Sequence, residues 1–103
     1  MNRVRIPTSD SYQDSLIESL KESEEAAAYI EAILEAEDPE HNLLSSALQD
    51  VFEARIKMNN LSEEAKLNWE KLNKMLSESG GSEVYTLVAL LKALGFKLEV
   101  TLK

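Results

Sequence analysis

The sequence predicts an all-α domain of about five helices that contains a helix–turn–helix unit and ends in a β-strand. Two observations favour this class. Apolar residues recur three and four positions apart in several successive segments, which is the spacing of one buried helix face. The last segment, from Phe96 to Leu102, instead alternates apolar and polar residues as a strand does.

Length and composition indicate a single domain. The chain has 103 residues, of which 44% are apolar, so it can bury a core of its own and is too apolar to be disordered. We expect residues 1–12 to form a flexible arm and residues 13–103 to form the domain. Because Cys is absent, disulfides, zinc fingers and thiol catalysis are excluded. The apolar runs fall short of the ~18 residues of a membrane span and the start resembles no signal peptide, so we expect a cytoplasmic protein without a membrane partner.

Acidic residues concentrate in the first half of the chain. Residues 11–56 carry twelve acids against Lys21 and Arg55, whereas residues 57–81 are neutral and contain four lysines. Phosphate contacts dominate the affinity for nucleic acid, so any DNA surface must lie in the second half. The acidic half suits a basic protein partner. The alternative is that its carboxylates form an ordinary solvated helix face.

Three helices are expected before the helix–turn–helix unit. The first covers residues 13–21. Ser23 can cap the second helix, whose first turn contains acids, where the helix dipole favours them. The third helix is expected to begin at Pro39, with Asp38 as its cap, and to end near Lys57.

The helix–turn–helix unit is expected over residues 59–78. Asn59 or Asn60 can cap a helix of about six residues, Lys66–Leu67 forms the turn, and Asn68 caps the second helix.

A last helix is expected after a loop over residues 77–82. Ser82 caps this helix and Gly95 ends it. Its expected inner face consists of Val84, Leu87, Val88, Leu91 and Leu94.

The second helix of such a unit enters the major groove of DNA, where its first residues meet base edges. Asn can pair with adenine, Glu can accept from cytosine, and Lys can reach guanine or phosphate. The expected DNA contacts are Asn59, Asn60, Asn68, Trp69, Glu70, Lys71, Asn73, Lys74 and Ser77. For Trp69 two interpretations stay open: it stacks on a partner or a thymine methyl, or it folds back onto the core or the dimer interface.

A single terminal strand leaves backbone donors and acceptors without partners. It could pair with residues 3–6, with the same strand of a second copy, or with another protein. Leu90 also lies off the expected inner face of the last helix, and a homodimer would cover both features. The expected dimer interface consists of Leu90, Phe96, Leu98, Val100 and Leu102.

The reactive residues argue against an enzyme. His41 is the only His, Cys is absent, and no glycine-rich loop is present to hold a phosphate, so no nucleophile and base are assembled. Asp38 and His41 have a metal-like spacing, but a di-metal helical bundle needs paired Glu-x-x-His motifs. We expect no catalytic residue, no metal site and no cofactor, with His41 at the surface.

A series of landmarks runs along residues 16–98 in a characteristic order and spacing. They are Ala27-Ala28-Tyr29-Ile30-Glu31-Ala32, Asp38-Pro39, Ala47-Leu48-Gln49-Asp50-Val51, Met58, Leu67, Glu70, Leu72, Lys74-Met75-Leu76-Ser77, Gly80, Thr86-Leu87 and Leu91-Lys92-Ala93-Leu94-Gly95. In these landmarks the chain resembles the probable addiction-module antidote proteins, small helix–turn–helix antitoxins of bacterial toxin–antitoxin pairs.

The resemblance implies a lambda-repressor-like helix–turn–helix domain. It also implies a DNA-binding antitoxin that represses its own operon and neutralises a basic, RelE-like toxin, with operator DNA and the toxin as partners. The alternative function is a protein-interaction module on the same scaffold, which binds a basic protein through its acidic half and no longer reads DNA.

The chain departs from the family pattern within the unit itself. Lys66 stands in the turn, where members usually have Gly, and Trp69 and Asn73 stand where Arg and Tyr are usual. A residue other than Gly costs roughly 1 kcal/mol at positive φ, so we expect this turn to be different or strained. Without the guanidinium group, contacts to phosphate and guanine are weaker.

Overall fold

The computed structural model describes residues 9–103, which form five α-helices and no β-strand. The helices are α1 (Ser9–Ser19), α2 (Ser23–Leu34), α3 (Leu43–Lys57), α4 (Glu63–Ser79) and α5 (Ser82–Ala93). The helical class predicted from the sequence is therefore confirmed for these residues. The first helix begins earlier than predicted, so it takes up the last part of the expected arm; residues 1–8 of that arm lie outside the described residues.

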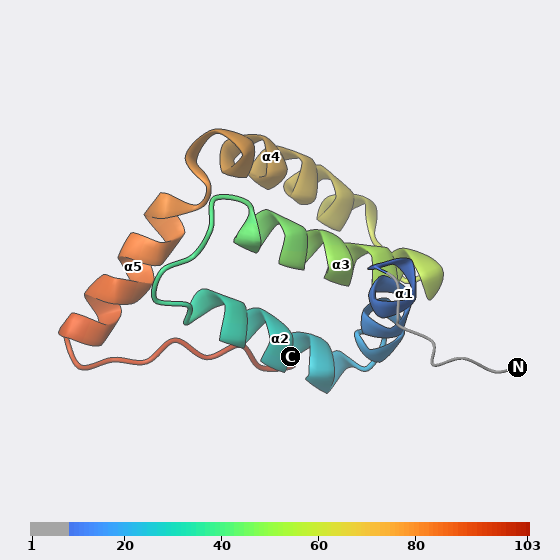
Figure 1. Cartoon of the computed structure of the whole chain (residues 1–103), viewed down its shortest axis with the longest axis horizontal. Coiled ribbons are helices and arrows are strands. Elements are labelled where there is room, and N and C mark those ends of the chain that lie inside the picture. The colour runs from blue at the N-terminus through green and yellow to red at the C-terminus, as the bar shows by residue number, and fades with distance from the viewer. Residues whose placement is uncertain (1–8) are drawn as a thin grey trace, which may run out of the picture.

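The central element of the fold is α3 (Figure 1). It packs against α1, α2 and α4, and α2 and α4 run along opposite sides of it. The first helix, α1, crosses one end of this layer, whereas α5 extends from the other end and packs against α2. Much of the surface of α5 therefore faces away from the other helices.

A cluster of buried apolar side chains lies among the first three helices. Ile17 in α1, Leu20 just after it, Ala26 in α2 and Ala54 in α3 form one cluster, and each is less than 5% exposed. The two alanines let the helix backbones approach closely, and the larger side chains fill the remaining space.

A buried carboxylate, Asp50 of α3, joins these three helices. It accepts hydrogen bonds from Nε2 of Gln13 in α1 and from the hydroxyl of Tyr29 in α2, the second at 3.3 Å. Burying a carboxylate without such partners would be costly. Burial, the charge of Asp50 and this hydrogen bond raise the pKa of Tyr29 to about 12. Asp50 therefore holds α1 and α2 against α3 through polar contacts.

Two predicted helix starts were wrong. Glu22, not Ser23, occupies the N-cap position of α2. The third helix begins at Leu43 and not at Pro39, because the preceding loop packs against the end of α4 instead of continuing the helix. In that loop His41 lies so close to Gly80 that a Cβ added there would be 2.7 Å from His41 Cδ2. The end of α3 at Lys57 agrees with the prediction.

The predicted pair of short helices is replaced by the single helix α4, so the turn expected at Lys66–Leu67 was wrong. Asn68 consequently lies inside a helix and caps nothing. Asn59 does not begin a helix either: its left-handed φ of 56° follows the end of α3, a conformation that Asn adopts more readily than most residues.

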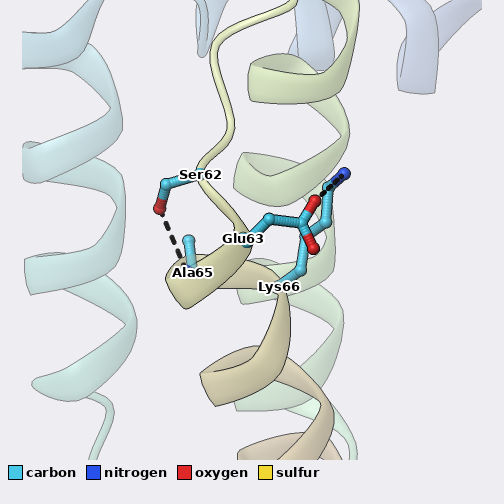
Figure 2. Close-up of polar contacts among 4 residues, drawn as sticks. All are labelled: Ser62, Glu63, Ala65 and Lys66. Atoms are coloured by element: carbon cyan, nitrogen blue, oxygen red, sulfur yellow. Dashed lines mark hydrogen bonds and ion pairs between the residues drawn. The ribbon is translucent and has the colours of Figure 1, made fainter.

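The start of α4 shows why the helix runs on (Figure 2). The hydroxyl of Ser62 accepts a hydrogen bond from the backbone N–H of Ala65 at 3.1 Å. The ammonium group of Lys66 lies 3.2 Å from the Glu63 carboxylate. An N-cap serine, acids in the first turn and good helix formers after them all favour one helix from Glu63 onward, with no Gly to interrupt it.

Only Gly80 and Gly81 separate α4 from α5, so the connection is shorter than the predicted loop. Both have positive φ values, 68° and 85°, which Gly adopts without a Cβ penalty. Gly81 takes the N-cap position expected for Ser82, which is instead the first residue of α5.

The C-terminal tail, residues 96–103, is extended but is not a strand. It returns along α2 (Figure 1), where the backbone N–H of Val100 donates to Oε1 of Glu31 at 2.9 Å. The predicted strand was therefore wrong: residues 9–103 contain no second strand to pair with it, and a side chain takes the place of a backbone acceptor. Pairing with residues 3–6 lies outside the described residues.

Candidate functional site

The surface of α4 carries most of the residues predicted to contact DNA. One side of this helix, marked by Ala65, Trp69, Leu72 and Leu76 at helical spacing, turns toward the rest of the protein. The remaining surface of the helix is solvent-exposed and includes Asn68, Glu70, Lys71, Asn73, Lys74 and Ser77. Of these, Asn68 and Asn73 flank the inner side, and the other four lie toward the outer face. The structure therefore places these side chains on one straight helix.

The other two predicted contacts, Asn59 and Asn60, are exposed in the link before α4. The backbone N–H of Asn60 donates to the carbonyl of Arg55 at 2.9 Å, which ties the link to the end of α3. Both asparagines thus stand near the start of α4, where backbone N–H groups and the helix dipole favour a phosphate.

Trp69 folds back onto the protein, as the second of the two interpretations has it. Its ring lies 5.7 Å from that of Phe52 in α3, centroid to centroid, at an interplanar angle of 33°. The two rings line a mostly apolar pocket of about 280 Å³ between α3 and α4, with Arg55 and Asn68 also on its wall. Trp69 therefore helps to dock α4 on α3, and it is not on the exposed surface that would meet base edges.

The charge of α4 does not favour a polyanion by itself. The helix carries Lys66, Lys71 and Lys74 against Glu63, Glu64, Glu70 and Glu78, a net charge of −1. Lys66 is occupied by the ion pair with Glu63. Lys71 and Lys74 are exposed, and the ion pairs within residues 9–103 do not include them, so they are the cations that this helix can offer to phosphate or guanine.

A second surface is strongly acidic and surrounds α2. The acids between residues 18 and 40 are exposed except for half-buried Glu31, and Lys21 pairs with only one of them, Glu18, at 3.0 Å. Part of this surface is a groove of about 440 Å³ between α2 and the C-terminal tail. From α2 it is lined by three alanines and by Glu24, Glu31 and Glu35, and from the tail by residues 100–102. Such a surface is complementary to a basic protein.

The residues predicted for a dimer interface fall into two groups. Leu90 on α5 is 53% exposed, and Phe96 and Leu102 are similarly exposed. Leu98 and Val100 are half-buried in the tail.

Leu87 and Leu94 are exposed as well, although both were expected on the inner face of α5. Too many apolar residues lie on this helix for one face. The signal that could have found the second face is the spacing of Leu87, Leu90 and Leu94 at i, i+3 and i+7.

Within residues 9–103 no group of three or more His, Cys, Asp or Glu side chains is arranged to hold a metal ion. His41 lies at the exposed surface, as predicted, beside Gly80. In the part of the chain that the structure describes, no helix has the length and apolarity to cross a membrane.

A family model described as "probable addiction module antidote protein" matches residues 11–102 of the chain. No curated protein and no solved structure shows significant similarity to it.

Proposed function

Because the chain belongs to the probable addiction module antidote family, whose role is that of an antitoxin acting on a toxin partner, we propose that it is a DNA-binding antitoxin. In this proposal it represses its own operon and neutralises a basic, RelE-like toxin. The observation that supports DNA binding is the set of exposed polar side chains along α4, with Lys71 and Lys74 at its centre.

DNA would be read by the outer face of α4. A single exposed helix can lie in the major groove, which is wide enough to admit it. Glu70, Lys71, Lys74 and Ser77 would face the groove, with Asn68 and Asn73 at its sides, and Asn59 and Asn60 would meet phosphate. Trp69 would act indirectly, because its contact with Phe52 sets the position of α4.

The test is a titration of the purified protein with its own upstream promoter fragment and with an unrelated fragment, at two salt concentrations. We expect saturable, promoter-specific binding that weakens as salt rises, because released counterions drive phosphate contacts. The double variant Lys71→Glu/Lys74→Glu should abolish this binding without unfolding the protein. The matched control Lys92→Glu/Lys103→Glu makes the same change in net charge elsewhere and should keep promoter preference. If Lys71→Glu/Lys74→Glu binds the promoter as the wild type does, α4 is not the surface that contacts DNA.

Toxin binding would use the acidic surface around α2. The natural probe is the product of an adjacent gene that encodes a small basic protein. Its binding should weaken with salt and should fall when Glu24, Glu31 and Glu35 are replaced by Gln. Replacing Glu63, Glu64 and Glu70 on α4 by Gln removes the same charge elsewhere and should leave binding unchanged. Equal losses in both variants would mean that only net charge matters.

The proposal includes a homodimer, since operators with two half-sites mirror the two-fold symmetry of their repressors. The dimer would place two α4 helices roughly 34 Å apart, one turn of DNA. Its interface would use Leu90, Phe96 and Leu102, which are already exposed, with Leu98 and Val100 joining if the tail leaves α2.

A second candidate is an antitoxin that binds its toxin and does not read DNA. Three observations favour it: α4 has no turn, Trp69 faces Phe52 instead of solvent, and the charge of α4 is slightly negative. This candidate predicts tight toxin binding with no promoter preference at either salt concentration, also when the toxin is present as a co-repressor. The same titration therefore separates the two functions.

A further inference from the structure

An uncovered apolar stripe runs along the outward side of α5. We use the name α5 stripe for Leu87, Leu90 and Leu94, which are 52%, 53% and 60% exposed. Phe96, 61% exposed, continues it beyond the helix end. The opposite side of α5, with Val88 buried and Tyr85 donating to the carbonyl of Ile33 at 2.8 Å, already holds the helix against α2. Contiguous exposed apolar surface of this kind marks an interaction site.

The residues of the stripe are arranged symmetrically about Leu90. Leu87 precedes it by about one helical turn and Leu94 follows it by a similar distance. In an antiparallel pair of identical helices related by a two-fold axis, a residue near the axis meets itself, and residues on either side meet each other. We propose that α5 packs antiparallel against α5 of a second copy, with Leu90 near the axis and Leu87 against the partner's Leu94.

Charges at the two ends of the stripe match this antiparallel arrangement. Glu83 lies in the first turn of α5, before Leu87, and Lys97 lies in the tail directly after Phe96, beyond the end of the helix; both are exposed. A parallel pair would bring like charges together, whereas the antiparallel pair sets Glu83 near the partner's Lys97. Hydrogen bonds from the Glu83 backbone N–H and the Ser79 hydroxyl lower the pKa of the Glu83 carboxyl. The two ends of the α5 stripe therefore carry opposite charges, as an antiparallel pair of identical copies requires.

A second copy fits this stripe better than a basic toxin does. The stripe has Glu83 at one end and Lys97 at the other, so it offers no net negative charge to a basic partner. The acidic surface lies instead around α2, beside the tail. The stripe and the acidic surface are thus separate. A dimer formed through the α5 stripe and Phe96, without Leu102 at the acidic groove, would leave the acidic surface open on both copies.

This inference deepens the homodimer of the proposed function and rests on it, but it does not depend on DNA or toxin binding. Because the chain has no Cys, a single introduced Cys reports one contact. We would introduce Leu87→Cys, Leu90→Cys and Leu94→Cys separately, at exposed positions where folding should persist, and check each by circular dichroism. Under mild oxidation Leu90→Cys should form covalent dimers by itself, since a disulfide needs Cβ atoms about 4 Å apart. Leu87→Cys and Leu94→Cys should cross-link mainly when mixed.

The control is Leu67→Cys on α4, which is 58% exposed and should cross-link far less. Self-linking of Leu87→Cys and of Leu94→Cys without a gain on mixing would show a parallel pair and overturn the proposal. Cross-linking of Leu67→Cys as strong as that of Leu90→Cys would overturn it too, because it would then report random collision.

Sedimentation of the protein alone gives an independent test. Leu90→Lys should raise the dimer dissociation constant more than about tenfold, because it brings two like charges together at the axis and removes the apolar contact between the two leucines. Glu83→Lys and Lys97→Glu should each weaken the dimer, and the double variant should restore it. A wild-type protein that is monomeric at all concentrations overturns the inference. Promoter or toxin binding by that monomer would show that the rest of the proposed function survives.

Discussion

The two halves of the molecule are stabilised differently. In the first half, α1, α2 and α3 share a buried apolar cluster, and Asp50 links all three helices through side-chain hydrogen bonds. In the second half, α4 and α5 each use one side for packing and leave large apolar residues exposed on the rest, among them Leu67, Met75 and Leu90. The second half thus exposes apolar surface of the kind that interfaces bury.

This difference suggests a division of labour. The first half supplies most of the stability of the monomer, and its outer surface contributes charge. The second half keeps exposed the side chains through which we propose that it meets DNA and a second copy. A substitution of similar size should therefore have a different consequence in each half: loss of folding in the first, and loss of association in the second.

The largest expected effect is at Leu20, which is almost completely buried in the first half. Leu20→Ala should lower the free energy of unfolding by about 2–5 kcal/mol, because it removes apolar contacts and leaves a cavity. The matched substitution Leu90→Ala in the α5 stripe should change the stability of the monomer by less than about 0.5 kcal/mol, as surface substitutions usually do. Urea unfolding at a protein concentration where the monomer prevails measures both. Equal losses would contradict the contrast between the halves.

A smaller loss of folding stability is expected from substitution of Gly80, where the two halves meet. Its φ is 68°, and a Cβ would lie 2.7 Å from Cδ2 and 2.9 Å from the carbonyl oxygen of His41. Gly80→Ala should therefore cost more than the roughly 1–2 kcal/mol of backbone strain alone. Gly95 also has a positive φ, but nothing lies within 4 Å of its added Cβ, so Gly95→Ala should show the strain alone. Thermal unfolding of the two variants compares them, and an equal cost would mean that the His41 loop moves freely aside.

Sequence reasoning succeeded where a local rule and the packing agree. The second helix was expected to follow Ser23 and to have acids in its first turn, and the end of α3 at Lys57 was found correctly. The first residues of the helices were less predictable, because neighbouring residues can often serve equally well as the N-cap. Pro39 is a good first helical residue, yet contacts between His41 and Gly80 keep its loop out of the helix. No local pattern contains that contact.

The turn at Lys66–Leu67 failed for a different reason. It was predicted because Asn59, Asn60 and Asn68 could each cap a short helix. In the structure Ser62 caps instead, acids follow it, and Lys66 pairs with Glu63, so one helix runs through the predicted turn. The prediction of a terminal strand was wrong for another reason. Alternation of apolar and polar residues indicates an extended segment with two different faces, but a strand also needs a second strand to pair with. Seven of the nine candidate DNA residues lie on α4, and Asn59 and Asn60 lie in the link before it. Among the seven, Trp69 turns inward, and its contact with Phe52 depends on how α4 docks.

A loss of about 1 kcal/mol is expected from Ser62→Ala, which removes the side chain that accepts from Ala65 N–H at the start of α4. Ser77→Ala in the same helix is the control, because the Ser77 hydroxyl donates only to the carbonyl of Lys74 within the helix. Amide hydrogen exchange should show faster opening of the first turn of α4 in Ser62→Ala alone. If that turn opens no faster, the cap does not set the start of the helix.

The smallest effect is expected at Tyr29 and depends on pH. Burial, the charge of Asp50 and their hydrogen bond raise the pKa of Tyr29 from 10.0 to about 12, so the folded state favours the protonated phenol. This contribution to stability is fully present below pH 10 and is lost as the pH rises from 10 to 12. Tyr29→Phe should cost less than about 1 kcal/mol at neutral pH, because the hydrogen bond is long. It should also make the free energy of unfolding fall less steeply between these pH values.

Tyr85→Phe is the comparison in the other half. Burial raises the pKa of Tyr85 without a carboxylate beside it, so this variant should flatten the pH dependence less. If both variants change the pH dependence equally, the Asp50 carboxylate adds nothing to the pKa shift of Tyr29. The contrast between the halves would then depend on apolar burial alone.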